Sequence, residues 1–183
     1  MNRAVLIQAV ALAAGLAAGP VLAQGHQLYA GLQGRSVKAL SDREIADLRA
    51  GRGMGLALPA ELNGYPGPMH VLEHADAMGL SAEQRGRTQA LHDAMKREAI
   101  PLGERLIEQE ARLDRLFASR EITPETLSAA TGEIAETQGS LRAAHLKYHL
   151  AMMDVLSADQ VARYGELRGY GAGGHGAHGP RRH

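Results

Sequence analysis

The sequence of 183 residues contains no cysteine, no tryptophan and only one phenylalanine. Without cysteine the chain forms no disulfide bond, so its stability must come from packing, from assembly or from a bound metal. Because large aromatic side chains are so scarce, a core must be built from leucine, alanine, methionine and isoleucine. Such a core suits packed helices.

An excess of charge of either sign is also missing. The chain carries 20 basic and 20 acidic residues, and so neutral a chain offers no electrostatic footprint for nucleic acid. The glycine-rich stretch GRGMG at 51–55 lacks the Gly-Lys-Ser/Thr ending of a phosphate-binding loop, so we interpret it as a turn. No nucleophile stands in a pattern that pairs it with a base. We therefore expect a protein that is not an enzyme and binds no nucleic acid.

The first 23 residues match the pattern of a cleavable secretory signal peptide. They combine a basic start at Arg3, an apolar stretch over 4–16 and a small-residue ending at Ala23. Glycine and proline interrupt the apolar region, so a retained membrane helix of ~20 residues is not expected. We expect export to the periplasm and cleavage before Gln24. The mature protein should have no membrane span.

Residues 24–67 are rich in glycine and predict an N-terminal extension with one short helix. Ser41 and Glu44 have the spacing of a capping box that opens this helix, and Gly51 can end it. The stretch LPAELNGYPGP at 58–68 contains three prolines and two glycines. There we expect an extended connection rather than a helix or strand.

Residues 68–168 predict a helical domain that opens with two helices. Pro68 can occupy the first turn of a helix that reaches about Met78 and ends at the glycine that follows. A long amphipathic helix should come next, running to about Ser119. Pro101 lies inside this helix and should kink it.

A second long helix is expected after the turn at 120–122, because TPE at 123–125 is a strong helix start. Apolar residues recur every seven positions along both long helices, which gives each a coiled-coil-like face. Helices joined by so short a turn should lie antiparallel. The sequence thus predicts an all-α fold, a bent antiparallel helical hairpin with short flanking helices. A last short helix is expected over 158–168, and 169–183 predict a flexible tail rich in glycine and histidine.

One internal similarity stands out. LSAEQRGRTQAL at 80–91 and LSADQVARYGEL at 156–167 share the pattern L-S-A-acid-Q-x-x-R-x-x-x-L. Each copy reads as an N-cap followed by a helix, and together they bracket the predicted hairpin. The motif residues are Leu80, Ser81, Gln84, Leu156, Ser157 and Gln160.

This pair of motifs resembles the repeated Leu-Thr-x-x-Gln motif of the periplasmic Spy/CpxP family, with serine in place of threonine. The similarity covers roughly residues 68–168 and includes heavy-metal relatives of the ZraP and CnrX type. It implies a small all-α protein, usually a homodimer, whose bent hairpins build a concave cradle. Such proteins act as ATP-independent chaperones of unfolded envelope proteins, as inhibitors that contact a sensor or regulator of envelope stress, or as metal binders.

The stretch MHVLEH at 69–74 holds His70, Glu73 and His74 in the H-x-x-E-H order of inverted zinc peptidases. In such an enzyme the histidines bind zinc and the glutamate acts as the base. Nothing else in the chain resembles those enzymes, so the peptidase is only an alternative. The same spacing places both imidazoles on one face of a helix, where they can reach one ion.

The resemblance implies where metal ligands would lie. It implies an H-x-x-x-H pair before the first motif, a carboxylate on the following helix and an H-x-x-x-M pair before the second motif. His70 and His74 match the first pair, and the carboxylate's place falls on His92. The family register puts the last pair on Tyr148 and Met152. A slip of one residue would put this pair on His149 and Met153, which have the same H-x-x-x-M spacing.

On the returning helix, His145 and His149 repeat the spacing of four residues. The candidate metal ligands are therefore His70, His74, His92, His145, His149, Met152 and Met153. Imidazole and thioether donors suit Zn, Cu, Ni or Co better than Mg or Ca. Alternatively, the histidines are ordinary helix residues and the methionines belong to the core. The tail histidines His175, His178 and His183 can catch metal loosely.

These observations predict a periplasmic metal-binding protein of envelope or heavy-metal stress. A chaperone or signalling inhibitor without a metal role is the alternative, and the zinc peptidase is a third class.

Overall fold

The computed structural model describes residues 29–170. The predicted signal peptide and the tail histidines lie outside the described residues. The chain divides into two units, Met1–Ala30 and Gly31–His183, and all the helices described belong to the second. Within the described range every helix or strand element is a helix, which confirms the predicted all-α fold.

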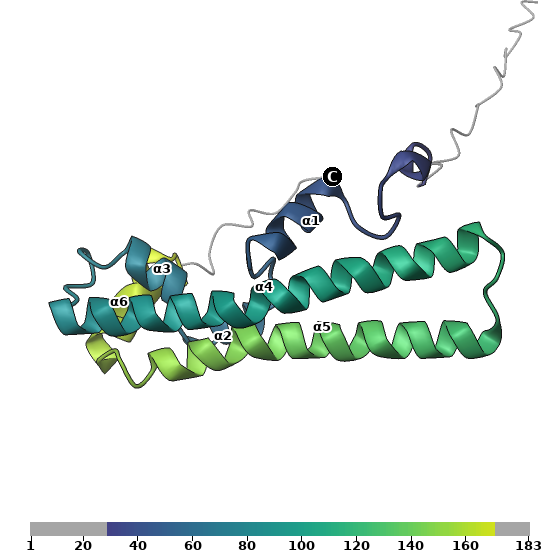
Figure 1. Cartoon of the computed structure of the whole chain (residues 1–183). Coiled ribbons are helices and arrows are strands. Elements are labelled where there is room, and N and C mark those ends of the chain that lie inside the picture. The colour runs from purple at the N-terminus through teal and green to yellow at the C-terminus, as the bar shows by residue number, and fades with distance from the viewer. Residues whose placement is uncertain (1–28, 171–183) are drawn as a thin grey trace, which may run out of the picture. The chain divides into compact units, whose positions relative to one another are not determined.

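Two long helices form the predicted antiparallel hairpin. α4 (Ala82–Ala118) and α5 (Pro124–Met152) are joined by a short turn in which Arg120 has a φ of 60°, and Figure 1 shows them side by side. α4 changes direction near its middle, where Pro101 lies inside the helix. Proline has no N–H to bond to the preceding turn, and its ring crowds that turn, so it bends the helix.

Four helices begin with a capping box. In each box the cap side chain accepts a hydrogen bond from the N–H three residues later, and the side chain of that residue bonds back to the cap N–H. The caps are Ser41, Ser81, Thr123 and Ser157. Each such cap contributes about 1 kcal/mol. They fix the starts of α4 and α5, and also of α1 (Asp42–Arg49) and α6 (Ala158–Leu167).

The buried side chains form two clusters along the hairpin. The first packs α1 against the middle of the long helices, with Leu48, Ala99 and Leu141 among its members. The second lies at the open end of the hairpin and joins α3 (Pro68–Glu73) to α6. The residues of the predicted seven-residue spacing are buried at Ile134, Leu141 and Tyr148 on α5 and at Val155 just beyond its end, whereas Leu127 beside the turn is 39% exposed.

The N-terminal extension packs on the hairpin through its short helices. A single 3₁₀ turn, η1 (Leu32–Gly34), precedes α1, which contacts α4. At their closest approach, a Cβ added to Gly103 would stand only 2.6 Å from the carbonyl oxygen of Leu48. Only glycine lets the two backbones come so close.

The prediction of an extended connection over 58–68 is wrong for its first four residues. These residues form α2 (Leu58–Glu61), which contacts α5. Pro59 lies in the first turn of α2, where the N–H that proline lacks would have no helical partner. The proline therefore permits the helix instead of preventing it.

The helix predicted from Pro68 to about Met78 is shorter than expected. α3 ends at Glu73, and His74 caps it with a φ of −103°. The chain then forms a separate turn that ends at Gly79 with a φ of 64°. This turn buries two of its apolar side chains at the open end of the hairpin, a gain in packing that no local pattern reports.

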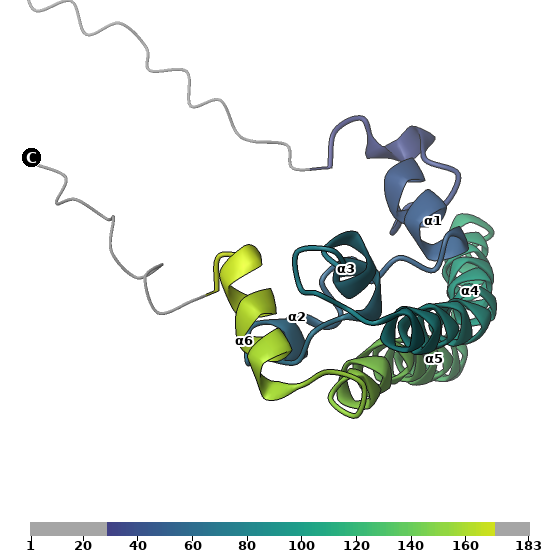
Figure 2. The same cartoon turned by 90° about the vertical axis from the view of Figure 1, so that its left-hand side faces the viewer.

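The two motif copies meet at that open end. Gln84 donates to Oε1 of Gln160 at 2.8 Å, and Gln160 donates to Oε1 of Gln84 at 3.0 Å. Gln84 also donates to the carbonyl oxygen of Val155 at 2.9 Å, while Leu80 and Leu156 are buried nearby. Figure 2 looks onto this end and shows α2, α3 and α6 grouped beside the long helices. The motifs therefore hold α6 to the start of α4.

Candidate metal site

A cavity of about 620 Å³ lies between the extension, α3 and the two long helices. Four of the predicted ligands line it: His70 on α3, His92 on α4, and His145 and His149 on α5. The rest of the wall comes from the extension, from neighbouring residues of α3 and α4, and from Arg168 and Tyr170, which follow α6. The fold thus brings imidazoles from three helices to one cavity.

His145 and His149 lie one helical turn apart on the buried face of α5. His145 is 2% exposed, and its Nε2 has no hydrogen-bond partner. Burial, followed by the charge of His149, lowers the pKa of His145, which favours the neutral ring that binds metals. Nδ1 of His149 lies 2.7 Å from the carbonyl oxygen of Tyr65. A carbonyl oxygen only accepts, so Nδ1 carries a proton, and in the neutral ring the lone pair is on Nε2.

Two glycines of the extension lie against these rings. A Cβ added to Gly67 would stand 2.8 Å from Cε1 and 3.0 Å from Nε2 of His149, too close for any other residue to fit without a shift. A Cβ on Gly53 would stand 3.5 Å from Nδ1 of His145, an ordinary contact. The backbone of the extension therefore covers both imidazoles of α5.

His92 and His70 reach the cavity from α4 and α3. Nδ1 of His92 is buried without a hydrogen-bond partner; Oδ1 of Asp93 lies 3.4 Å away but outside hydrogen-bond geometry. Nδ1 of His70 lies 2.9 Å from Oε2 of Glu73, and this bond lowers the pKa of Glu73. A carboxylate on one ring nitrogen fixes the orientation of a histidine and leaves the other nitrogen for a metal.

The sequence analysis missed a buried carboxylate, that of Glu61 at the end of α2. It is 7% exposed and lines the same cavity. Its Oε1 accepts hydrogen bonds from the hydroxyl of Tyr164, from Nε of Arg168 at 3.2 Å and from the hydroxyl of Tyr170 at 3.4 Å. Its Oε2 has no partner. No local pattern marks this residue, because its burial depends on a tyrosine 103 residues later in the chain.

The other three predicted ligands do not line the cavity. His74 caps α3 through its backbone. Met152 is fully buried in the apolar cluster between α3 and α6, and Met153 is 39% exposed at the end of α5. Met152 therefore serves the core, as methionine at helical spacing often does. Their roles as ligands stay predictions.

Within residues 29–170, no three histidine, aspartate or glutamate side chains converge closely enough to hold a metal ion. The donor set nevertheless fits one in its chemistry, because imidazole and carboxylate are the ligands that Zn²⁺ and related metals take. Three of the donors carry a buried atom without a partner: Glu61 Oε2, His92 Nδ1 and His145 Nε2. Buried polar atoms rarely lack a hydrogen-bond partner. To hold a metal, these side chains must turn toward one another.

A comparison with protein-family models identifies the family of this chain. The family model for heavy-metal resistance matches residues 4–163. The chain belongs to the heavy-metal resistance family. This family is part of the Spy/CpxP/ZraP-like LTxxQ clan, which confirms the resemblance drawn from the two motifs. The match also includes the extension, which the motifs had left outside.

No curated protein and no solved structure matched this chain. In the part of it that the structure describes, no helix is both long and apolar enough to cross a membrane.

Proposed function

We propose that this protein is a periplasmic, non-enzymatic protein that binds a transition metal during metal or envelope stress. One observation carries the proposal: imidazoles from three helices line a single cavity, and two of them have buried nitrogens without partners. Membership of the heavy-metal resistance family supports the same role.

The donor set decides which metals suit the cavity. Neutral imidazoles with a carboxylate favour Zn²⁺, Cu²⁺, Ni²⁺ or Co²⁺ over Mg²⁺ and Ca²⁺, which prefer oxygen ligands. Because the donors do not yet converge, binding includes rotation of side chains. Such a site should bind more weakly than a preorganised one.

The zinc peptidase alternative gains nothing from this geometry. His74 does not line the cavity that His70 lines, so the two histidines of the H-x-x-E-H stretch do not meet there. Glu73, the base in such an enzyme, instead bonds to Nδ1 of His70. The stretch therefore acts as a short helix that delivers one imidazole.

Titrations of the mature protein with Zn²⁺, Ni²⁺, Co²⁺ and Cu²⁺ test the proposal, with the tail histidines replaced by alanine to remove loose binding. Replacing both His145 and His149 by alanine should abolish the tight site and leave most of the helicity, because alanine is the best helix former. The matched control is His74→Ala, which removes an imidazole outside the cavity. The proposal fails if the parent binds none of these ions below roughly millimolar, or if the double variant binds as tightly as the parent.

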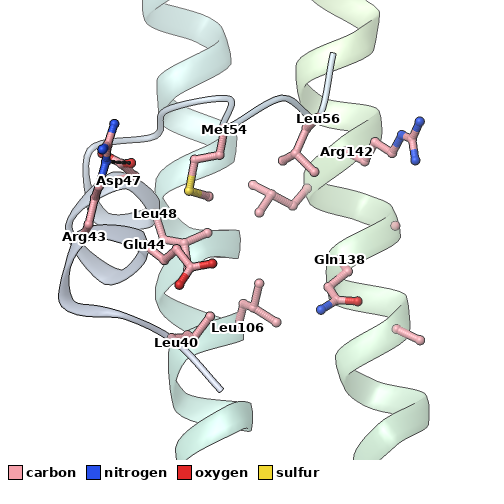
Figure 3. Close-up of a pocket in the computed structure, with 13 residues that line it drawn as sticks. Leu40, Arg43, Glu44, Asp47, Leu48, Met54, Leu56, Leu106, Gln138 and Arg142 are labelled. Atoms are coloured by element: carbon pink, nitrogen blue, oxygen red, sulfur yellow. Dashed lines mark ion pairs between the residues drawn. The ribbon is translucent and has the colours of Figure 1, made fainter. Parts of the chain in front are cut away.

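A second hollow favours an additional chaperone function. It has a volume of about 720 Å³ and lies between α1, the loop at Met54 and the two long helices, as Figure 3 shows. Its apolar lining comes from Leu40, Leu48, Met54, Leu56, Leu106 and Leu141. Leu48, Leu106 and Leu141 are buried at its floor, whereas Met54 is 42% exposed and Leu40 and Leu56 are half-buried. Apolar side chains that reach the solvent in this way can bind unfolded segments. A chaperone or signalling inhibitor without a metal role remains the alternative function.

Suppression of aggregation of an unfolded client without ATP tests this second function. Leu56→Asp places a charge in the hollow and should reduce the suppression. Leu62→Asp is the matched control, because Leu62 is 60% exposed and does not line the hollow. A parent that protects no client at several-fold excess, or two variants of equal effect, would remove the support for this function.

A further inference from the structure

Glu61 differs from the other acidic residue at the histidine cavity. Within the described chain two acidic residues line this cavity, Asp47 and Glu61. Asp47 is already engaged, since its Oδ1 lies 2.6 Å from an Arg52 nitrogen and its Oδ2 lies 3.9 Å from Nε of Arg43. Glu61 has an oxygen, Oε2, that no group uses, although the residue is more than nine-tenths buried.

The surroundings of Glu61 explain why Oε2 has no hydrogen-bond partner. Nδ1 of His149 lies 3.8 Å from it, but the proton on Nδ1 is given to the carbonyl oxygen of Tyr65. The three hydrogen-bond donors near Glu61, from Tyr164, Arg168 and Tyr170, all bond to its other oxygen, Oε1. Burial and the hydrogen bond to Glu61 raise the pKa of Tyr164, so its hydroxyl stays protonated and keeps donating. Arg168 supplies a positive charge to the same oxygen.

Gly67 places no side chain between His149 and Glu61. The point that a Cβ on Gly67 would occupy lies 3.0 Å from Nε2 of His149 and 3.6 Å from Oε2 of Glu61. Nε2 of His149 and the unpaired Oε2 of Glu61 therefore both lie beside Gly67, with no side chain of that residue between them. The flanking Pro66 and Pro68 are fully buried, which fixes the path of the chain there.

Charge gives the carboxylate a role that the imidazoles cannot fill. A divalent cation held by neutral imidazoles alone would leave its charge uncompensated beside the buried side chains of His145 and His149, at a cost in free energy. We propose that Glu61 is the anionic ligand of the metal site, binding through Oε2 beside Nε2 of His149. This inference rests on the proposed metal-binding function.

Because Glu61 belongs to the extension and His149 to α5, a shared metal would fasten the extension to the hairpin. Metal binding should then protect the backbone amides of residues 53–67 from hydrogen exchange. The extension would thus be part of the site and not only a flanking segment.

Cobalt titration of the full mature chain tests the inference, because the visible absorption of Co²⁺ reports its ligands. Glu61→Gln keeps the shape and an acceptor for Tyr164 but removes the anionic oxygen. It should weaken Co²⁺ binding by at least about tenfold, a loss that even outer-shell changes reach. It should also alter the Co²⁺ spectrum and abolish the added protection at 53–67. Asp47→Asn is the matched control, since it removes the same charge from the same cavity and should bind as the parent does.

The outcomes separate this inference from the proposed function. If the parent binds Co²⁺ and Glu61→Gln matches it in affinity and spectrum, Glu61 is not a ligand and the proposed function stands. Equal weakening in Glu61→Gln and Asp47→Asn would show a general effect of charge and would also overturn the inference. If the parent binds neither Co²⁺ nor Zn²⁺, both fail. Should Glu61→Gln lose helicity, Gly67→Ala decides, because it keeps the glutamate and fills the space; binding equal to the parent then overturns the inference.

Discussion

Burial decides what the side chains of the cavity do. His145, His149 and Glu61 are each more than nine-tenths buried, and all three line the cavity. Two of them carry an atom without a partner. In the unfolded chain such an atom would be solvated, whereas here a ligand, a bound water or a change of rotamer must supply its partner. These residues are therefore the ones whose properties a titration should reveal.

The stability of the metal-free protein should fall as the pH falls below about 6.5, where a free imidazole takes up a proton. His145 of the unfolded chain is protonated near that pH, whereas burial lowers its pKa in the folded protein. The unfolded state thus binds more protons in this window, and acid favours unfolding. Urea unfolding with a chelator, at about pH 7.5 and about pH 5.5, measures the loss.

The matched variant for this prediction is His145→Gln, in which the loss between the two pH values should be smaller than in the parent. An equal loss would contradict it. Other groups that line the cavity come from every element packed around His145. They are Asp47, Arg52, Glu61, His70, His92, Lys96, His149, Arg168 and Tyr170. These groups are the same in the parent and in His145→Gln, so the difference between their losses of stability reports on His145 alone.

The glutamine pair of the two motifs should carry measurable stability. Gln84→Ala leaves Gln160 and the carbonyl of Val155 without their partner, so it should lower the free energy of unfolding by about 1–3 kcal/mol. Gln89→Ala removes an exposed glutamine of the same helix that donates to Asp93, and it should change stability by less than about 0.5 kcal/mol. Urea unfolding followed by circular dichroism compares the two. Equal effects would mean that the motif pair contributes no more than a surface residue.

At the scale of elements, the docking of α1 on α4 depends on one missing side chain. Gly103→Ala would put a Cβ against the carbonyl of Leu48, so it should push α1 away and cost about 1–3 kcal/mol. Gly86→Ala, on the same helix with nothing within 4 Å, should instead stabilise the protein by about 0.5–1 kcal/mol. Thermal unfolding gives both values. A Gly103→Ala protein as stable as Gly86→Ala would show that α1 docks loosely.

The elements also show what a sequence reveals. The starts of α1, α4 and α6 were predictable because a capping box is a local signal of four residues, and the start of α5 because Thr-Pro-Glu at 123–125 marks a helix start. The early end of α3 and the existence of α2 were not, because packing against distant parts of the chain decides them. Likewise, the spacing of His145 and His149 showed that they share a face. Which imidazoles share a cavity, and that Glu61 joins them, depends on the path of the extension.

For the whole molecule, the predicted dimer still has to be tested. Phe117 and Leu127, on either side of the turn between the long helices, are 54% and 39% exposed. Large apolar side chains so exposed favour burial against another copy. Sedimentation of the mature chain should therefore give about twice the mass of one chain, and replacing both residues by aspartate should shift it toward one. A parent that sediments as one chain at every concentration would contradict the dimer.

The separation in sequence between contacting residues increases from the turn of the hairpin toward its open end. It is 21 residues for Arg112 and Glu133, 49 for Glu98 and Lys147, 76 for Gln84 and Gln160, and 103 for Glu61 and Tyr164. Contacts that close longer loops cost more entropy and slow folding. The hairpin should therefore zip from the turn outward, with the cavity assembled last. Local opening of that end, while the rest stays folded, would then give the proposed metal a route into and out of the cavity.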